Sequence, residues 1–368
     1  MEWHSSTYTE RNNMLKIFQE FREKLDDIMR QAFGHRIVLY GYDYTGRFLE
    51  WYAEYYHSIK MDFIITQDWS VGVPYNFPLF RDSLFSFNYM DVKDAIVWLA
   101  IPENEEITKK LEGNGYIKNK TYFNFLEIVY GEGIYIRKDC EEGDVFQKRK
   151  TGWYGVQFME WLEYLYNCNL VTAIDSTKFV DAIDGGHSYR ISTQKEIFPI
   201  LDKCHCIPQE EDGIFDFGCG KGGAMLTFLD YGFRKVGGVE YEKKIYEVMV
   251  SNFSKLGIDY AKDEKEKGKK VLCLQGNAAE VTTPLDGYNW FYYFDPFDRE
   301  IFSETIRNIC ESLKRKPRKV HIININPKYY NVILESGYFV LTNQFCVSVR
   351  QKVVDIFVTK KKFEERIE

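Results

Sequence analysis

Short apolar segments alternate with amphipathic segments along most of the chain. Apolar residues recur at spacings of three and four from Met14 to Ile28, which predicts an amphipathic helix at the start. Continuous apolar runs then predict buried strands, and the segments 47–56 and 103–112 predict helices. The predicted strands of this first half cover residues 36–40, 61–66 and 94–100. Alternating strands and helices predict an α/β fold built on a parallel sheet.

The second half repeats this alternation more regularly and ends differently. Five predicted strands, each separated by helical sequence, cover residues 214–217, 235–240, 270–275, 289–295 and 319–324. Two further strands, 338–349 and 352–359, have no helix between them and are therefore predicted to form an antiparallel pair. The charged stretch 259–269 is interpreted as a solvated loop.

The pattern predicts two domains, since 368 residues exceed one compact core. The segment 138–150 is charged and lacks periodicity, so we place the boundary there. The predicted parts are an N-terminal helix (1–33), a first α/β domain (34–137), a linker with an aromatic helical segment (138–200) and a second α/β domain (201–368).

A glycine turn follows the first strand of the second domain. Gly218, Gly220 and Gly222 stand two residues apart after Asp216, and the next strand ends in Glu240. Glycines let the backbone approach a ligand, and a carboxylate at the next strand end accepts both hydroxyls of a ribose. The sequence therefore predicts a site for a nucleoside-bearing cofactor.

This D-x-G-x-G-x-G turn with its following acidic residue resembles class I S-adenosylmethionine-dependent methyltransferases. The resemblance implies a seven-stranded sheet that ends in an antiparallel hairpin, with S-adenosylmethionine as cofactor. It implies that Asp216 arranges the turn or meets the cofactor's ammonium group. It further implies that Glu240 holds the ribose and that Asn277, after the third strand, meets the adenine amine.

Residues 189–359 more closely resemble uncharacterised microbial methyltransferases related to the DOT1-type lysine methyltransferases. The shared pattern is D-x-G-C-G-K-G, then G-V-E, then N-P-F, with Asp295 here in place of the Asn. The same resemblance implies that Tyr189 and Thr193 lie in the segment that closes over the cofactor.

The fourth strand of this domain ends in Asp295, Pro296 and Phe297. Ligands of open α/β sheets bind at the carboxyl ends of strands, so Asp295 is expected to face the cofactor crevice. Amine-directed methyltransferases carry Asp or Asn, two prolines and an aromatic residue here, whose oxygens accept from the target nitrogen and whose ring attracts the developing cation. The single proline departs from that pattern, so nitrogen is only somewhat favoured over oxygen as the acceptor.

Several nearby residues have both a chemical and a structural interpretation. His187 is a possible base or a surface residue, and Asp298 is interpreted as the cap of the next helix. Lys221 points either to the ligand or to water. Asn324 and Asn326 either reach the acceptor or satisfy backbone groups at a strand end. Ser192 or Thr193, with Glu196, is predicted to cap a helix at 194–203.

The first domain carries a weaker glycine pattern. Gly41 and Gly46 occupy the first and third positions of G-x-G-x-x-G, but Asp43 stands where the backbone must approach a pyrophosphate. A carboxylate there repels phosphate, although Asp68 after the second strand remains able to meet a ribose. This domain resembles the small Rossmann-like domains found beside sugar-modifying and methyl-transferring enzymes. We interpret it as a degenerate nucleotide-binding domain with a structural or partner-binding role, including formation of a homo-oligomer.

Composition and charge limit the functions that remain. Hydrophobic residues make up 45% and charged residues 28%, which is typical of a soluble protein, and the net charge of −7 disfavours non-specific nucleic-acid binding. The basic run 314–319 is interpreted as a solvated helix end. No apolar run approaches the roughly 20 residues needed to cross a bilayer. No secretory signal is recognised either.

The eight cysteines are scattered, which is typical of reduced thiols in a cytosol, so a cytoplasmic location is expected. Cys204, His205 and Cys206 lack a second ligand pair, so no metal site is predicted. We expect a methyltransferase that acts on an unidentified small molecule or protein amine. The alternatives are a nucleic-acid methyltransferase and a non-catalytic cofactor-binding or scaffold protein.

Overall fold

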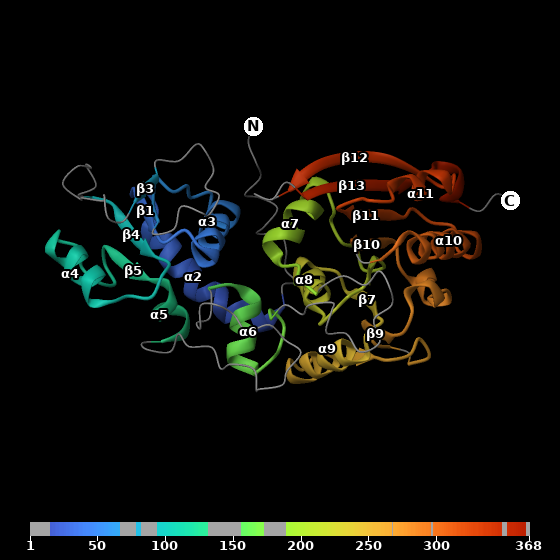
Figure 1. The fold of residues 1–368 in the computed structure, drawn as a ribbon, viewed down its shortest axis with the longest axis horizontal. Helices are drawn as coiled ribbons and strands as arrows, with labels where there is room; N and C mark the ends of the chain where they lie inside the picture. Colours follow the sequence, from blue (N-terminus) through green and yellow to red (C-terminus); the bar gives the residue numbers. More distant parts are fainter. Residues whose placement is uncertain are drawn as a thin grey trace. The chain divides into compact units, whose positions relative to one another are not determined.

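The structure is a computed structural model that describes residues 15–66, 79–81, 94–131, 156–172, 189–266, 268–295, 297–347 and 352–365. These residues form two compact units (Figure 1). Described residues up to Leu165 belong to the first unit, and those from Tyr166 onward belong to the second.

The first unit contains a five-stranded parallel sheet in the order β3-β2-β1-β4-β5. Its strands are β1 (Ile37–Tyr40), β2 (Phe63–Thr66), β3 (Leu79–Arg81), β4 (Ile96–Leu99) and β5 (Tyr122–Asn124). Its helices are η1 (Lys16–Phe18), α2 (Gln19–Ala32), α3 (Tyr44–His57), α4 (Glu105–Gly113), α5 (Phe125–Tyr130) and α6 (Phe158–Tyr166). The amphipathic first helix and the three predicted strands are present, and β3 and β5 extend the sheet on both sides.

Aromatic side chains hold the helices of this unit together. Phe21 of α2 lies 5.0 Å from Phe158 and 5.9 Å from Trp161 of α6, measured between ring centroids, and Phe48 of α3 lies 5.7 Å from Phe158. Such ring pairs add to the free energy gained by burying their area. Helix α6, which lies within the segment that we assigned to a linker, therefore packs as part of the first unit.

The second unit contains an eight-stranded sheet in the order β12-β13-β11-β10-β6-β7-β9-β8. Its strands are β6 (Gly213–Phe217), β7 (Lys235–Glu240), β8 (Tyr260–Ala261), β9 (Val271–Gln275), β10 (Trp290–Phe294), β11 (His321–Ile325), β12 (Phe339–Val347) and β13 (Lys352–Thr359). All neighbours are parallel except β13, which is antiparallel to both β11 and β12. The predicted C-terminal hairpin is therefore confirmed.

The predicted strand count is wrong by one. Tyr260 and Ala261 pair in parallel with Val271 and Leu272, so part of the stretch predicted to be a loop forms the edge strand β8. The residues that follow this pair in the sequence are strongly charged. The apolar periodicity that predicts a strand is therefore absent there. The predicted fold class, two α/β units whose second sheet ends in an antiparallel hairpin, is otherwise confirmed.

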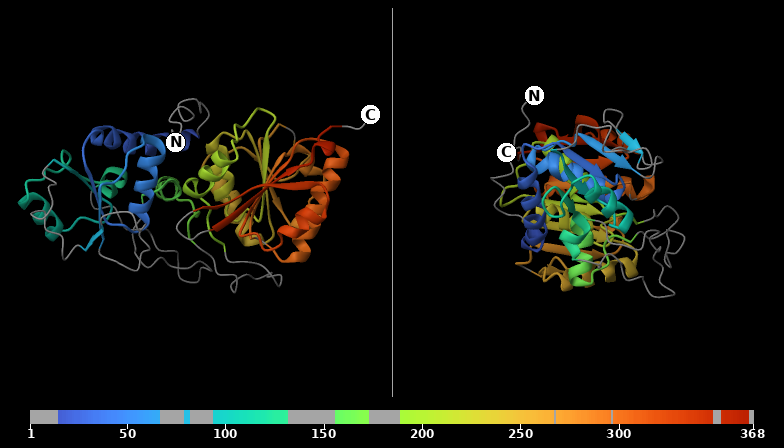
Figure 2. Two further views of the ribbon diagram at one scale, coloured as in Figure 1. Left: turned by 90° about the horizontal axis from the view of Figure 1, so that it is seen from above. Right: turned by 90° about the vertical axis from the view of Figure 1, so that its left-hand side faces the viewer.

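Helices cover both faces of the second sheet. They are α7 (Gln194–Lys203), α8 (Gly223–Tyr231), α9 (Lys243–Lys255), α10 (Arg299–Arg315) and α11 (Tyr330–Glu335), with η5 (Ala278–Glu280), η6 (Thr283–Gly287) and η7 (Lys361–Phe363). In the left view of Figure 2 the sheet is seen nearly along its plane, with α10 on one side and α8 on the other. The α10 face buries a large apolar cluster that includes Phe217, Tyr293 and Phe302. This core fixes the strands whose carboxyl ends carry the candidate site.

In the described part of the chain, no helix combines the length and apolar character that a membrane span requires. The same residues contain no cluster of three or more His, Cys, Asp or Glu side chains arranged to hold a metal ion.

Candidate functional site

The glycine turn between β6 and α8 adopts a conformation that favours glycine. The φ angles of Gly218, Gly220 and Gly222 are +81°, +55° and +88°. The amides of Gly218 and Cys219 both donate to the carbonyl of Val239 at 3.0 Å, so the turn lies directly on strand β7. The predicted strand, turn and helix are thus present in the order read from the sequence.

Gly238 explains how closely the turn approaches β7. A Cβ atom at this position would lie 2.7 Å from Cys219 Cβ and 2.7 Å from Met225 Sδ, closer than real contacts permit. The close approach brings the amides of the turn to the end of β7, where Glu240 stands.

Glu240 is held against the turn by two backbone amides. Its Oε2 accepts from Gly220 N at 3.0 Å, and its Oε1 accepts from Glu242 N at 2.8 Å. Burial raises the pKa of the Glu240 carboxyl to about 7. Because a carboxylate oxygen has two lone pairs, each oxygen retains one acceptor position for a ligand hydroxyl.

Asp216 lies beside Glu240 but deeper in the sheet. The register pairs Asp216 with Gly238, two residues before Glu240, so the two carboxyl groups occur on neighbouring strands. Asp216 is only 3% exposed, and burial, followed by the nearby Glu240 carboxylate, raises the pKa of Asp216 to about 8. Burial and the neighbouring Glu240 therefore both favour the neutral form of the Asp216 carboxyl.

Tyr189 covers the turn from the other side. A Cβ atom on Gly220 would lie 2.4 Å from Tyr189 Cδ2, so the ring rests on the glycine. The Tyr189 hydroxyl donates to the carbonyl of Leu170 at 2.7 Å. Thr193 forms a capping box with Glu196 at the start of α7, as predicted. Glu240 and Tyr189 thus both contact the turn at Gly220. Thr193 instead caps the start of α7.

Lys221 is a member of this site whose orientation the sequence left open. Its side chain is fully buried, and its ammonium donates to Asn169 Oδ1 at 2.7 Å and to the Thr172 carbonyl at 2.8 Å. It also lies 5.1 Å from the centroid of the Tyr189 ring. Lys221 therefore points away from water and fastens residues 169–172 and Tyr189 to the glycine turn.

Asn252 of α9 completes this connection. Its Oδ1 accepts from Asn169 N at 2.9 Å, and its Nδ2 donates to the carbonyls of Asn169 at 2.9 Å and of Lys221 at 3.2 Å. The buried amide thus ties three backbone segments together. Nothing in the local sequence around Asn252 signals this role, because its partners lie more than 30 residues away.

Asn277 lies just beyond β9, at the expected end of the sheet. Its Oδ1 accepts from Ala279 N at 3.0 Å and so caps η5, while its Nδ2 makes no hydrogen bond with the described residues. The preceding residue, Gly276, has a φ of +147°, and a Cβ atom there would meet nothing within 4 Å. Open space therefore adjoins the backbone between Glu240 and Asn277.

Asp295 directly follows the carboxyl end of β10. Its φ is +43°, unusual for a residue other than glycine, and its Oδ1 lies 2.8 Å from Lys328 Nζ. Phe297 packs against the apolar cluster beneath α10. Pro296, the middle residue of the predicted catalytic triplet, lies outside the described residues. Lys328 was not singled out in the sequence, and no spacing signal identifies it.

Among the remaining candidate residues of this site, the structure assigns a role to Asp298 alone. Asp298 accepts from the amides of Glu300 and Ile301 at 3.0 Å, which confirms that it caps α10. Asn326 adopts a φ of +54° after β11. The Nδ2 of Asn324 is buried and has no hydrogen-bond partner among the described residues. His187 lies outside them.

In the first unit, Asp43 caps α3. Its Oδ1 accepts from Thr45 N at 3.0 Å and from Gly46 N at 3.4 Å. These amides belong to the helix N-terminus that would otherwise receive a phosphate. A Cβ atom on Gly46 would lie 2.0 Å from the Gly41 carbonyl oxygen, so the glycine serves tight packing of strand and helix. Asp68 lies outside the described residues.

No family model matches the chain, and no curated protein matches it. Solved structures that match part of this chain include an S-adenosylmethionine-dependent methyltransferase from Aquifex aeolicus, with 13% identity, a TM-score of 0.34 and coverage of 45% of this chain and 92% of the other. A putative methylase from Haemophilus influenzae has 12% identity, a TM-score of 0.35 and coverage of 48% and 94%. A TehB-like methyltransferase from Corynebacterium glutamicum has 12% identity, a TM-score of 0.32 and coverage of 46% and 90%. At identities this low, the functional argument rests on the residues of the site itself.

Proposed function

We propose that this protein is an S-adenosylmethionine-dependent methyltransferase whose second unit binds the cofactor. The observation that carries the proposal is the position of Glu240, whose carboxylate is fixed by Gly220 N and Glu242 N at the end of β7 beside a glycine turn. A diol such as a ribose offers two donors to a carboxylate placed in this way. The closer relation to DOT1-type methyltransferases and a cytoplasmic location belong to the same proposal.

The residues around Glu240 fit such a cofactor. The Nδ2 donor of Asn277 and the open space beside Gly276 suit a planar, nitrogen-rich ring. The raised pKa of Asp216 favours its neutral form and so limits the negative charge next to Glu240. When bound, the cofactor supplies an activated methyl group on a sulfonium, so the protein has only to align the acceptor and leave its lone pair available.

Asp295 is the residue to which we assign acceptor binding. It lies at the carboxyl end of β10, the strand next to β6, and ligands of open α/β sheets bind outside these ends. An acceptor amine would share or displace the contact between Asp295 and Lys328. We favour nitrogen somewhat over oxygen as the acceptor atom, in a small molecule or a protein amine.

Calorimetric titration with S-adenosylmethionine tests the proposal. We expect one binding site in the wild type, weakened roughly 10- to 100-fold in Glu240→Ala, because hydrogen bonds to a charged group contribute about 1.5–3 kcal/mol. Glu247→Ala removes an exposed carboxylate from α9 of the same unit and serves as the matched control. If the folded wild type binds no S-adenosylmethionine, or if both variants bind alike, the proposed site is wrong.

The role of Asp295 requires a separate measurement. Asp295→Ala is expected to keep the wild-type affinity for S-adenosylmethionine but to lose transfer of a labelled methyl group to a panel of amines, alcohols and peptides. Loss of binding together with transfer would place Asp295 in the cofactor site instead. Wild-type transfer by the variant would remove it from the acceptor site.

A further inference from the structure

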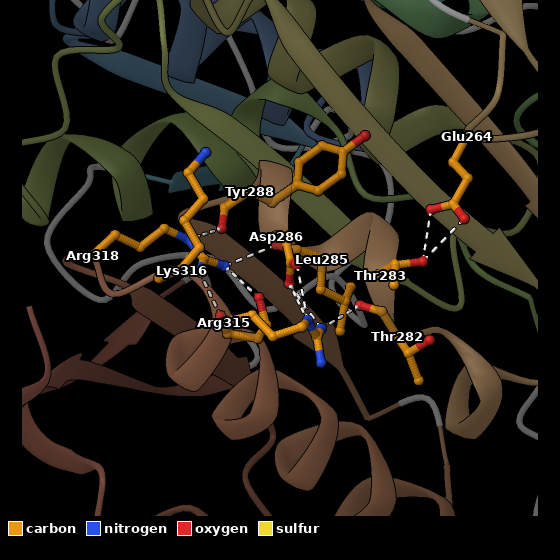
Figure 3. Close-up of polar contacts among 10 residues, drawn as sticks. Glu264, Thr282, Thr283, Leu285, Asp286, Tyr288, Arg315, Lys316 and Arg318 are labelled. Carbon is orange, nitrogen blue, oxygen red and sulfur yellow. Dashed lines mark hydrogen bonds and ion pairs between the residues drawn. The ribbon is translucent and has the colours of Figure 1, made fainter. Parts of the chain in front are cut away.

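Four cationic side chains lie near the amino end of strand β7, away from Glu240 at its carboxyl end; Figure 3 shows three of them, Arg315, Lys316 and Arg318. Lys235 begins β7, the strand whose other end carries Glu240, and Arg315 is the last residue of α10. Lys316 and Arg318 follow in the connection from α10 to β11. Lys316 and Arg318 belong to the basic run 314–319, which we interpreted from the sequence as a solvated helix end. The proposed methyl transfer uses none of the four cations.

Arg315 is fully paired with the one carboxylate of this cluster. Its Nη2 donates to Asp286 Oδ1 at 2.8 Å and its Nε donates to Asp286 Oδ2 at 2.9 Å, a two-pronged contact. The same guanidinium holds the pKa of the Asp286 carboxyl below its usual value. Asp286 supplies one negative charge beside four cations, so a net positive charge remains in this cluster.

Arg318 donates hydrogen bonds only to neutral groups, although the Asp286 carboxylate is close enough to act on its charge. Its Nε and Nη2 donate to the carbonyls of Tyr288 and Leu285 at 2.8 Å, and its Nη1 donates to the carbonyl of Lys316 at 2.8 Å. Further bonds go to Ser312, so every donor of the guanidinium is directed at the protein. Arg318 thus contributes a fixed positive charge, whereas any hydrogen bonds to a ligand have to come from the neighbouring lysines.

Lys235 is placed in the cluster by its packing. Its ammonium lies 4.8 Å from the centroid of the Tyr288 ring, and a Cβ atom on Gly287 would lie 2.1 Å from its Nζ. It forms no ion pair with a described residue, and burial, followed by the charges of Lys316 and Arg318, lowers the pKa of Lys235. The Lys316 ammonium also has no ion pair among the described residues, and no contact reaches it in Figure 3.

We propose that Lys235, Lys316 and Arg318 form a binding site for a compact phosphate-bearing anion of the polyphosphate type. Three like charges in one place repel one another, and a polyvalent anion would relieve that repulsion, which a single carboxylate achieves only in part. Lysine ammonium groups bind phosphate as point charges with freely oriented donors. The charges are concentrated around one turn and do not form a stripe, which suits a small polyanion better than an extended nucleic-acid strand. The proposal does not depend on methyl transfer.

Calorimetric titration of the full chain with sodium tripolyphosphate tests this site. We expect one site in the wild type, weaker at about 150 mM salt than at low salt because screening acts on exposed charges. The double variant Lys235→Met/Lys316→Met is expected to bind at least roughly tenfold more weakly, since two charge-assisted contacts are removed. Lys314→Met, which removes an exposed lysine of α10 that is paired with Glu311, is the control and should retain wild-type affinity.

Two further titrations, one with ATP and one with a single-stranded RNA oligonucleotide, test which kind of phosphate compound binds. ATP and tripolyphosphate are expected to bind alike, because only the phosphate groups are recognised. A single-stranded RNA oligonucleotide that binds more tightly than tripolyphosphate, and is lost in the double variant, would overturn the compact anion in favour of a nucleic acid. No tripolyphosphate binding by the wild type at low salt would also overturn the proposal, as would equal affinity in the double variant. Should that variant fail to fold, Lys316→Met alone gives the same comparison at an exposed position in a connection.

Discussion

Gly220→Ala tests whether the glycine turn is set by backbone conformation alone or also by the ring above it. Gly220 combines a φ of +55° with a Tyr189 ring that a Cβ atom would approach to 2.4 Å. Gly257 has a similar φ of +66°, yet nothing lies within 4 Å of its Cβ position. Gly257→Ala is therefore a matched control that introduces the same backbone strain without the collision.

The two costs can be estimated separately. A non-glycine residue in the left-handed region costs about 1–2 kcal/mol, which is the whole expected effect of Gly257→Ala. In Gly220→Ala the ring has to shift by roughly 1 Å, which adds about 1–3 kcal/mol for overpacking and about 1 kcal/mol if the hydrogen bond from Tyr189 to the Leu170 carbonyl breaks. We expect Gly220→Ala to destabilise the second unit by about 3–6 kcal/mol in total.

The free energy of unfolding is measured by urea titration with hydrogen-exchange mass spectrometry of peptides from β6 and α8, which reports on the second unit alone. A double-mutant cycle then identifies the cause. In a Tyr189→Ala background the ring is absent, so the cost of Gly220→Ala should fall to that of Gly257→Ala. An unchanged cost in that background would refute the argument that the Tyr189 ring determines the need for glycine.

Two further predictions concern buried ionisable groups of the same site, Asp216 and Lys221. Burial raises the pKa of Asp216 to about 8, so the folded state binds a proton that the unfolded state releases near pH 4, and stability should fall as pH rises from about 4 to 8. In urea titrations at several pH values, the free energy of unfolding of Asp216→Asn should fall less over this pH range. An equal fall in both proteins would contradict the raised pKa of Asp216. Lys221→Met leaves Asn169 Oδ1 and the Thr172 carbonyl without their donor and should destabilise the second unit by about 2–4 kcal/mol. Lys243→Met, an exposed lysine at the start of α9, should change stability by less than about 0.5 kcal/mol, and equal effects of the two substitutions would show that Lys221 is not a structural cation.

Much of the fold was predictable because its signals are local. Apolar segments located three strands of the first sheet and seven of the second, and the missing helix between the last two strands required an antiparallel pair. The turn at Gly218–Gly222 and the cap at Asp298 were also evident, since glycine spacing and capping residues act within one turn of the chain. The edge strand β8 was missed because two residues in a charged stretch carry no periodicity.

What the sequence by itself determined is therefore the set of elements and the position of Glu240 at the end of a strand beside a glycine turn. Only the tertiary structure decided that Lys221 bonds to Asn169, which is 52 residues away, and that the Tyr189 ring rests on Gly220. It likewise decided that Lys328 pairs with Asp295 and that Lys235 and Arg318 both lie against Tyr288. Periodicity and capping reflect interactions over a few residues, whereas these contacts arise only when distant segments pack against a common core.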